Sequence, residues 1–587
     1  MPIHNHTLHK DALLKDFAPK DSAPKDFVPK DSMIECINHR GLNPENSKPF
    51  IKPSLPSLAS SSLPVRLSFQ LMTCAEPIDV VIASIQSILA IKSVDDEILI
   101  VDNNNTKTSL YEPLATFCRD LDPKLNVHFY HIDAVVGFKA GALNVALGLM
   151  NPDATHIVVV DSDYQALPQA RRAIAAAIDD YPEHALLQFP QFYRDDHRLY
   201  IHSELNHYFN YHLYRPFNRK RALSTGTYAV IRRDALLTLG GWSCESITED
   251  AQMGVLMHHY GLRSRFIPEV IATGLLPTSV GDLINQRKRW IYGNVQVLSR
   301  YFSFSTSHLI QTNDSTAAEE NNLIEEDSSN HNVKERRNYV FAHLSQLSAW
   351  INFTGIFIVL HILALCIILG ALATNAHLVL SSLLTPLYLV YAGYGVFLIR
   401  RLWAYLNDEA PLNHQNNTRP TLVQKVNTWG LHLNFWELGA LSWLPVLLGY
   451  KKPFICTPKQ QSIRTRYQNQ LANIRALPKL LLVLNVITML ITAPFSPLYT
   501  PIIFAAALTV TVLKLWAAKI MLSNYAYAPT TTPQPQSKTA ITKLNKLNKD
   551  SDALSMLKLE QSHTTEIFNT KAAPSNSPFK DDNVVNF

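Results

Sequence analysis

The sequence predicts an α/β domain over residues 67–304, followed by an α-helical membrane region over residues 338–525. In the first range, apolar runs typical of buried strands alternate with helical stretches. In the second range, long apolar stretches follow one another. Charged residues make up 17% of the chain, against about 25% in typical globular proteins. This deficit is expected when part of a chain lies in lipid, and 587 residues are too many for one compact domain.

Residues 1–66 are predicted to form a disordered tail. From Lys15 onward the sequence repeats as KDFAP, KDSAP, KDFVP and KDS. The proline of each full unit blocks a helix, and the alternating charges leave little apolar surface to bury. The tail has no basic start followed by an apolar run and a small-residue cleavage site, so we do not expect it to be a secretory signal.

Two predicted strands of the α/β domain end in acidic residues. The apolar runs at residues 97–101 and 156–160 are followed by Asp102 and Asp161, and helical stretches such as residues 139–150 lie between and after them. Alternation of strands and helices indicates a parallel sheet. Because ligands bind such sheets at the carboxyl ends of the strands, chemistry is expected around these two aspartates.

Four apolar stretches are predicted to span a membrane. They comprise residues 347–373, 378–399, 480–493 and 502–522. A spanning helix needs about 20 apolar residues, which the first two stretches supply and the third does not fully reach. Two further segments are predicted to be disordered: residues 305–337, which are polar and acidic, and residues 526–587, which are rich in Thr, Pro, Ser and Lys.

Basic residues near the apolar stretches predict their orientation. Arg336 and Arg337 precede the first stretch, and Arg400 and Arg401 follow the second. Because Lys and Arg accumulate on the cytoplasmic side, the α/β domain is predicted to lie in the cytoplasm, most naturally at a bacterial inner membrane. The apolar segment 429–450 has basic residues at both ends. We interpret it as an interfacial or re-entrant helix, which keeps both ends on one side.

The sequence Asp161-Ser162-Asp163 is a DxD element that follows a predicted strand. Two carboxylates one residue apart on a turn can reach a hard divalent cation together, and Mg²⁺ or Mn²⁺ held in this way usually binds a substrate's diphosphate as well. The spacing alone is a weak signal, because an ordinary surface turn often carries it. Its place at the end of an apolar strand favours a metal site at Asp161 and Asp163.

Four motifs occur in a fixed order along the chain. They are Asp102, the DxD element, Thr248-Glu249-Asp250 and Gln286-Arg287-Lys288-Arg289-Trp290. The order D, DxD, TED, QxxRW resembles the membrane-embedded family-2 glycosyltransferases, which include cellulose synthase and related β-glucan and hyaluronan synthases. The sequence GFKAGALN at 137–144 is similar to the loop before the DxD strand in that family. Residues 453–459 are similar to its FxVTxK gating loop, with Cys456 in place of Val.

This resemblance implies the nucleotide-sugar-binding fold called GT-A for the α/β domain. Asp102 would hold the uridine of a UDP-sugar, and Asp161 and Asp163 would hold its diphosphate together with Mg²⁺ or Mn²⁺, which neutralises the leaving group. Arg289 suits the diphosphate because its planar fork can bind phosphate oxygens in two places. Lys139 is a further candidate for the phosphates, and an ordinary solvated helix lysine is the alternative.

The resemblance also implies a general base and an acceptor site. Asp250 would remove the proton of an acceptor hydroxyl as it attacks the anomeric carbon, which gives a single displacement with inversion. Glu249 is the alternative base, although successive residues usually point apart. Gln286 and Trp290 would bind the acceptor, with the indole as a flat face for its terminal sugar. For Trp290 the alternative is a tryptophan of the membrane interface.

The function predicted from these motifs is inverting, metal-dependent transfer of a sugar, with glucose preferred, from a UDP-sugar to a growing β-linked polysaccharide. Two alternatives stay open: transfer of one sugar to a lipid acceptor, and a catalytically silent membrane scaffold or transporter. The predicted partners are the UDP-sugar, a polysaccharide or lipid acceptor, and the lipid bilayer. A net charge of +5 is too weak to indicate nucleic-acid binding, and no protein partner is indicated.

Overall fold

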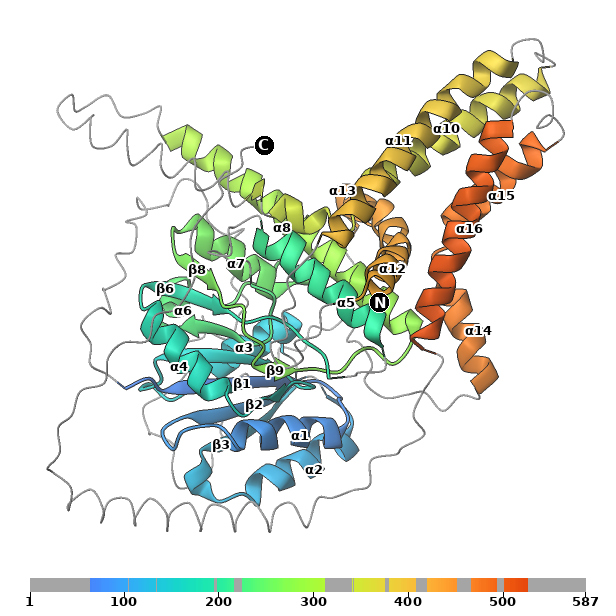
Figure 1. The fold of residues 1–587 in the computed structure, drawn as a ribbon. Helices are drawn as coiled ribbons and strands as arrows, with labels where there is room; N and C mark the ends of the chain where they lie inside the picture. Colours follow the sequence, from blue (N-terminus) through green and yellow to red (C-terminus); the bar gives the residue numbers. More distant parts are fainter. Residues whose placement is uncertain are drawn as a thin grey trace, which may run out of the picture. The chain divides into compact units, whose positions relative to one another are not determined.

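A central sheet organises the α/β domain in the computed structural model of the chain (Figure 1). The structure describes residues 64–103, 105–133, 135–194, 198–215, 224–311, 340–341, 343–374, 380–407, 420–450, 466–493 and 501–525. Within these residues, one seven-stranded sheet has the order β3-β2-β1-β4-β7-β6-β8, and β5 pairs with β9 separately. The strand bounds are β1 (Leu67–Thr73), β2 (Glu97–Asn103), β3 (Val127–Ile132), β4 (His156–Asp161), β5 (Gln165–Ala166), β6 (His184–Gln188), β7 (Ala229–Arg232), β8 (Arg263–Phe266) and β9 (Ala272–Thr273). Strands β1 to β4 pair in parallel, whereas β7 is antiparallel to its neighbours β4 and β6.

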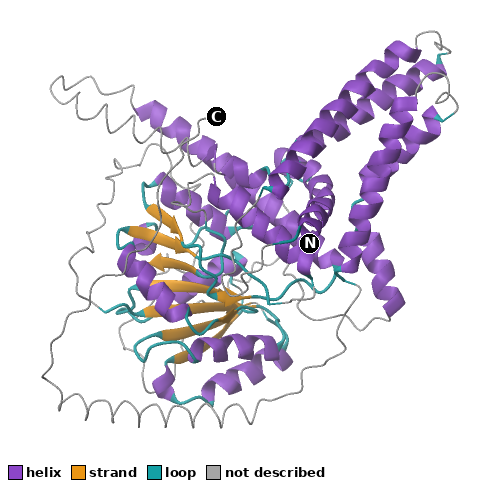
Figure 2. Ribbon diagram, in the orientation of Figure 1, coloured by secondary structure: helices purple, strands orange, loops and turns teal. Residues whose placement is uncertain are grey.

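Helices cover both faces of this sheet (Figure 2). In β2, Leu99 and Val101 face one side and Ile98 and Ile100 the other, because successive strand residues alternate. All four side chains are at most 1% exposed. A parallel strand buried on both sides requires a helical layer on each face. The helices of this domain are α1 (Ile78–Leu89), α2 (Thr108–Arg119), α3 (Phe138–Leu149), α4 (Ala170–Asp180), α5 (Leu199–His207), α6 (Arg233–Thr238), α7 (Glu249–His259) and α8 (Val280–Gln311).

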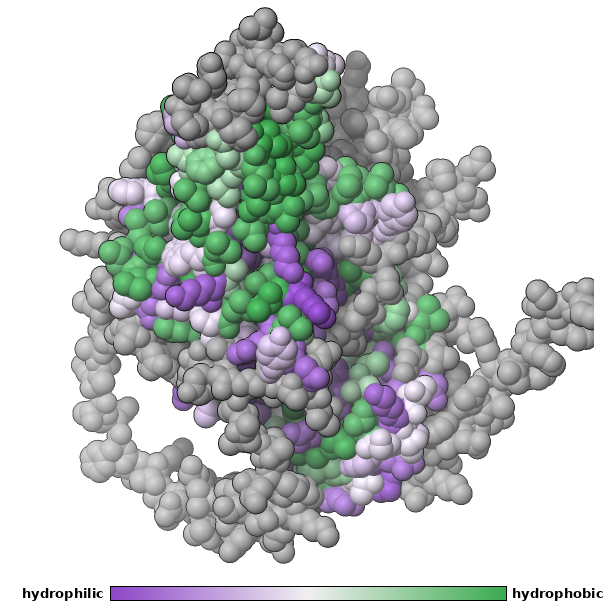
Figure 3. All heavy atoms as spheres, turned by 90° about the vertical axis from the view of Figure 1, so that its right-hand side faces the viewer, coloured by the Kyte–Doolittle hydropathy of each residue, from purple (hydrophilic) through white to green (hydrophobic). Residues whose placement is uncertain are grey.

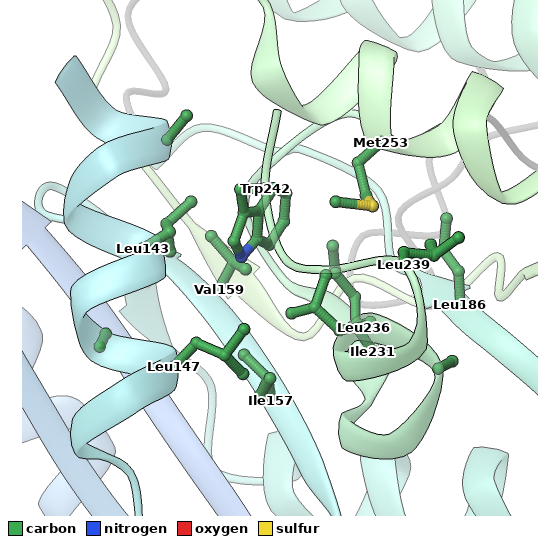
Figure 4. Close-up of a cluster of buried hydrophobic side chains, with 14 of the residues drawn as sticks. Leu143, Leu147, Ile157, Val159, Leu186, Ile231, Leu236, Leu239, Trp242 and Met253 are labelled. Carbon is green, nitrogen blue, oxygen red and sulfur yellow. The ribbon is translucent and has the colours of Figure 1, made fainter. Parts of the chain in front are cut away.

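One hydrophobic cluster fixes α3 and α7 against the sheet (Figure 4). Leu143 and Leu147 of α3 pack with Val159 of β4, and Trp242 and Met253 close the cluster beside them. Burying one such side chain contributes about 1.5–3 kcal/mol. The cluster therefore sets where the first turns of α3 and α7 lie relative to the carboxyl end of β4.

All four apolar stretches that were predicted to span a membrane form helices. The helices after the α/β domain are α10 (Phe353–Ala373), α11 (Leu380–Leu406), α12 (Leu422–Ala440), α13 (Leu444–Leu447), α14 (Arg466–Ala476), α15 (Leu480–Thr492) and α16 (Pro501–Ser523). Helix α10 runs beside α11, and α15 beside α16 (Figure 1). The predicted order of an α/β domain followed by an α-helical region is confirmed, and the GT-A type of the α/β domain stays a prediction.

Two helices in the described part of the chain are long and apolar enough to cross a membrane. They are Phe353–Gly370 and Pro501–Ser523, with mean hydropathies of 2.6 and 1.8. The helices Tyr467–Ala476 and Leu480–Thr492 meet the same criteria together, although they meet at an angle of 74°. Apolar side chains gather on the face formed by the helical region (Figure 3). These are features of a membrane protein, and the number of four spans stays a prediction.

The segment predicted as one interfacial or re-entrant helix, residues 429–450, is divided in two. Helix α12 begins before it and ends at Ala440, and the short helix α13 follows. Every residue from Thr428 to Ala440 is buried, whereas Leu447 and Tyr450 are 71% and 65% exposed. The first part is therefore enclosed by protein, and only the second part is free to meet lipid or water.

Helix α8 extends past the predicted domain boundary at residue 304. It continues to Gln311, so the first residues of the predicted disordered insertion are helical. Residues 305–311 contain neither Pro nor Gly, the two residues least favourable inside a helix. The rest of the insertion, the tail at residues 1–63, the stretch at 453–459 and the tail at 526–587 lie outside the described residues.

Candidate active site

The predicted site residues meet at the carboxyl edge of the parallel strands. The register pairs Thr73 at the end of β1 with Asp102 of β2, and Met72 of β1 with Asp161 of β4. Because Thr73 and Met72 are consecutive, their side chains point to opposite faces of the sheet. Asp102 and Asp161 therefore lie at one edge but on opposite faces, which the sequence did not predict.

Asp102 is held in a buried polar cluster. Its Oδ1 accepts hydrogen bonds from Thr73 Oγ1 at 2.7 Å and Asn105 Nδ2 at 3.2 Å. Its Oδ2 lies 2.8 Å from Nδ1 of His131, whose ring stacks on Tyr111 at a centroid distance of 3.7 Å. The Asp102 side chain is 2% exposed. These contacts fix the carboxylate in one orientation.

Sequence reasoning missed Thr73, Asn105 and His131, which surround Asp102. One signal could have found His131: it stands near the end of β3, and the register places it opposite Asp102. In an apolar sheet, polar residues at the ends of neighbouring strands are candidates for one site. His131 lies outside all four motifs.

The two carboxylates of the DxD element have different surroundings. Asp161 is 33% exposed at its side chain, and its Oδ1 accepts a hydrogen bond from Lys139 Nζ at 2.6 Å. Asp163 is 3% exposed, and its Oδ2 accepts a hydrogen bond from the backbone N–H of Leu275 at 2.9 Å. Arg194 Nη2 donates to the backbone carbonyl of Asp163 at 2.9 Å. Asp161 is thus the accessible carboxylate, and Asp163 is anchored in the fold.

Lys139 stands between the DxD element and the TED motif. Its Nζ is 2.6 Å from Asp161 Oδ1 and 3.4 Å from Glu249 Oε1. Burial acts to lower the Lys139 pKa, but the negative charges of Asp161, Glu249 and Asp250 outweigh burial, so the pKa is raised and the lysine stays cationic. The alternative of an ordinary solvated helix lysine does not describe this side chain, which is 20% exposed and ion-paired.

The donor atoms of the DxD element suit a hard divalent cation. Asp161 and Asp163 offer carboxylate oxygens, which Mg²⁺ and Mn²⁺ prefer. Among the described residues, no group of three or more His, Cys, Asp or Glu side chains is arranged to hold a metal by itself. Mg²⁺ is commonly bound by one or two carboxylates together with substrate phosphates. The residues present therefore fit a cation that arrives with a diphosphate.

Asp250 lies in the first turn of α7 and is half-buried. Burial, and next the negative charge of Glu249, raise the Asp250 pKa to about 7, although Lys139 acts in the opposite direction. Gly226 has a φ of +94° and lies against this carboxylate: a Cβ at Gly226 would come within 3.0 Å of Asp250 Oδ2. A carboxylate with a pKa near the working pH is suited to take up a proton in the reaction.

Glu249, the alternative base, has a different position. Its side chain is 10% exposed and faces Lys139. As whole residues, Asp250 is half-buried and Glu249 is buried. Both carboxylates lie close enough to Lys139 to act on its charge.

The QxxRW residues lie on the first turns of α8. Gln286 is 7% exposed, whereas Arg289 and Trp290 are half-buried. One turn further, Gly293 packs on the TED motif so closely that a Cβ there would come within 2.3 Å of Thr248 Cγ2. The TED and QxxRW motifs are therefore held together by a direct contact between Thr248 and α8.

Comparison with known proteins bears on the same residues. The description "Glycosyl transferase family 2" matches residues 71–240, and "Glycosyl transferase family group 2" matches residues 156–407. A UDP-forming cellulose synthase from Dictyostelium discoideum is 29% identical over 170 residues, which is 27% of this chain and 16% of that protein. A UDP-forming cellulose synthase from Pseudomonas fluorescens is 30% identical over 192 residues, which is 31% of this chain and 25% of that protein. The matches thus span a quarter or less of these relatives' own length.

Likeness to solved structures is low. The mannosyltransferase PcManGT from Pyrobaculum calidifontis aligns over 48% of this chain and 85% of its own, with 16% identity and a TM-score of 0.33. A score this low supports no conclusion. The two family descriptions together cover residues 71–407, which hold all four motifs and the first two apolar helices. The chain belongs to the family-2 glycosyltransferases and is of the cellulose synthase-like type.

Proposed function

We propose that the protein transfers a sugar from a UDP-sugar to a growing β-linked polysaccharide with inversion at the anomeric carbon. The observation that carries the proposal is the arrangement at the carboxyl edge of the sheet. There Lys139 links Asp161 of the DxD element to Glu249 of the TED motif, and Asp250 lies beside them. Glucose is the proposed sugar, which rests on the likeness to cellulose synthases.

In the proposed reaction, Asp250 accepts the proton of the acceptor hydroxyl. The hydroxyl oxygen forms a bond to the anomeric carbon as the bond from that carbon to the UDP oxygen breaks. General-base assistance of this kind contributes about 10²–10⁴ in rate. The negative charge that develops on UDP is met by Lys139 and Arg289. Asp102 holds the uridine, and its fixed carboxylate accepts hydrogen bonds from the ribose or base.

A divalent cation fits this site. Asp161 and Asp163 would hold Mg²⁺ or Mn²⁺, which would neutralise charge on the diphosphate. Asp163 is positioned by its bond from Leu275, so its carboxylate would meet the cation from a fixed place. Asp161 already pairs with Lys139, and the two cations would share this carboxylate or Lys139 would turn toward the phosphates.

The helical region is proposed to lie in the bilayer, with the α/β domain on the cytoplasmic side. The apolar helices support the first part of the proposal. The Lys and Arg residues at their ends support the second part. A polysaccharide that leaves the site would then cross the membrane through the same chain.

Membranes that contain the protein, incubated with a panel of radiolabelled UDP-sugars, test the function. We expect incorporation from UDP-glucose into polymer that stays in the aqueous or insoluble fraction. Label recovered only in the lipid-soluble fraction would instead support transfer to a lipid acceptor. No incorporation from any UDP-sugar would favour a silent scaffold. Membranes that contain the Asp250→Asn variant are the control for incorporation by other enzymes.

Trp290→Ala should weaken use of the acceptor and leave the donor site intact. The indole is half-buried, with the guanidinium of Arg287 over one face at 4.4 Å. The remaining surface is proposed to stack on the terminal sugar. Stacking of a nucleobase on an aromatic side chain contributes about 1–3 kcal/mol, and we expect a loss within this range, or roughly five- to hundredfold in acceptor affinity. Titration of the acceptor beside UDP binding measures both effects.

Trp290→Phe is the control, because it keeps a flat ring and should retain most of the activity. Equal loss of UDP binding in Trp290→Ala would show that the ring belongs to the donor site or the fold. An unchanged acceptor dependence would assign Trp290 to the membrane interface instead.

A further inference from the structure

A buried ion pair lies directly behind Trp290. Arg287, one turn before Trp290 on α8, is 1% exposed, and its Nη2 donates to Glu204 Oε2 at 2.7 Å. Glu204 belongs to α5 and is 0% exposed. Neither residue is among the three that define the QxxRW pattern, and neither belongs to the D, DxD or TED motif. The defining residues of the four motifs therefore do not include this pair.

The Arg287 guanidinium lies over two aromatic rings. Its central carbon is 4.4 Å from the centroid of Trp290 and 5.3 Å from that of Phe435 on α12. A planar guanidinium can stack on aromatic faces in a way that an ammonium cannot. Trp290, the residue proposed to carry the acceptor sugar, is thus backed by a flat cation that is itself fixed by Phe435 and Glu204.

The pair also joins three helices. Glu204 Oε2 bonds to α8 through Arg287, and Glu204 Oε1 lies 3.3 Å from Nε2 of His432 on α12. The other ring nitrogen of His432 contacts the hydroxyl of Tyr405 on α11. The orientation of the α8 side chains at Arg287 is therefore tied both to the α/β domain and to the helical region.

Stability does not explain this pair. Nε and Nη1 of Arg287 are buried without a hydrogen-bond partner. A buried donor left unpaired is unfavourable, and replacing a buried ion pair by apolar residues of similar size is often neutral or stabilising. A charged pair at this position is therefore better explained by the orientation it imposes than by the free energy of folding.

We propose that Arg287, held by Glu204, is a positioning residue that fixes the Trp290 ring for the acceptor sugar. The inference rests on the proposed function. It gives a role in acceptor placement to Arg287, which occupies the first variable position of the QxxRW motif. Arg287 does not touch the donor, and the substrate meets only the ring in front of it.

The test uses the full-length protein in membranes, with UDP-glucose as donor and cellohexaose as acceptor. Two variants avoid an unpaired buried charge. Arg287→Lys keeps the ion pair with Glu204 but removes the flat guanidinium that lies over the rings of Trp290 and Phe435. The double variant Glu204→Gln/Arg287→Met removes both charges and keeps the side-chain lengths. In both variants we expect the cellohexaose KM to rise by about ten- to hundredfold, since small misplacements of reacting groups have costs of this size.

UDP affinity and thermal stability should stay near those of the wild type in both variants. The matched control is Arg263→Met, which removes an exposed pair with Glu183 at 3.4 Å. It should change transfer by less than about twofold. The single change Arg287→Met, which leaves the buried Glu204 without its guanidinium partner, should be less stable than the double variant.

Each outcome decides the inference. If Arg287→Lys and the double variant keep the wild-type KM for cellohexaose, the pair has a structural role only and the inference is overturned. If UDP affinity falls together with acceptor affinity, Arg287 does not position Trp290 selectively, and the inference fails as well. A wild-type protein that transfers no sugar overturns the proposed function and this inference with it.

Discussion

Replacement of Asp250 by Asn should lower sugar transfer by about 10²–10⁴-fold while UDP-sugar binding persists, because only the proton-accepting charge is removed. Asn has nearly the same shape and still accepts a hydrogen bond, so the close contact with Gly226 is kept. UDP binding and sugar transfer measured side by side on the same membranes separate the two effects. A parallel loss of both would mean that Asp250 belongs to the donor site.

The pH profile gives a second readout of the same variant. Because burial and the charge of Glu249 raise the Asp250 pKa to about 7, wild-type transfer should rise as pH increases through about 7. The groups that set this value are Glu249, Lys139 and Asp161. The residual transfer of Asp250→Asn should lack this rise.

The stability of the folded protein should fall as pH increases through about 7, whereas sugar transfer should rise. A carboxyl group whose folded pKa lies above its unfolded value favours the folded state at low pH, and this contribution is lost as pH rises through the folded pKa. Asp250→Asn should therefore unfold at a higher temperature than the wild type above pH 7, and the difference should shrink toward pH 5. If the difference in unfolding temperature between Asp250→Asn and the wild type were the same at every pH in this range, the raised Asp250 pKa would be contradicted.

Glu249→Gln is the control for the assignment of the base. Glu249 is 10% exposed at its side chain and faces Lys139, so we expect a weaker effect on transfer than at Asp250. If Glu249→Gln abolished transfer while Asp250→Asn stayed near the wild-type rate, the base would be Glu249. Both variants keep the length of their side chains, so the comparison isolates the charge.

The strand ends could be predicted from the sequence because burial and chemistry leave local signals. An apolar run followed by an acidic residue marks the end of a buried strand in both β2 and β4. The register between strands has no such signal, because pairing depends on the whole sheet. For that reason the sequence placed Asp102 and Asp161 at one edge but not on opposite faces. His131 was missed for the same reason, since only the pairing of β2 with β3 brings it to Asp102.

The helical region was predictable in its elements and not in its contacts. Apolar length alone predicted the helices α10, α11, α15 and α16. The break after Ala440 and the burial of α12 depend on neighbouring helices, which local composition does not describe. Likewise, the sequence around Arg287 does not indicate its role, because its ion-pair partner Glu204 is distant in the sequence. Long-range pairing of this kind is the information that motif patterns lack.

Removal of divalent cations should abolish transfer, and added Mg²⁺ or Mn²⁺ should restore it. The physical reason is that Lys139 and Arg289 alone leave part of the diphosphate charge unneutralised, so UDP would be a poor leaving group. Transfer measured in chelator, and again after each metal is added, tests this directly. Full turnover in chelator would rule out the metal assignment for Asp161 and Asp163.

Asp161→Asn is the sharper of the two DxD variants. Asp161 is 33% exposed at its side chain, and Lys139 keeps Glu249 as a partner when the Asp161 charge is lost, so the fold should persist. Asp163 is 3% exposed and accepts the bond from Leu275, so its replacement also disturbs the loop. We expect Asp161→Asn to weaken metal-dependent UDP binding by roughly ten- to hundredfold, the equivalent of one charge-assisted contact of about 1.5–3 kcal/mol. Asp153→Asn, at an exposed pair with Arg66, is the matched control and should bind UDP like the wild type. If Asp161→Asn bound UDP like the wild type with metal present, the assignment of the cation to the DxD element would be wrong.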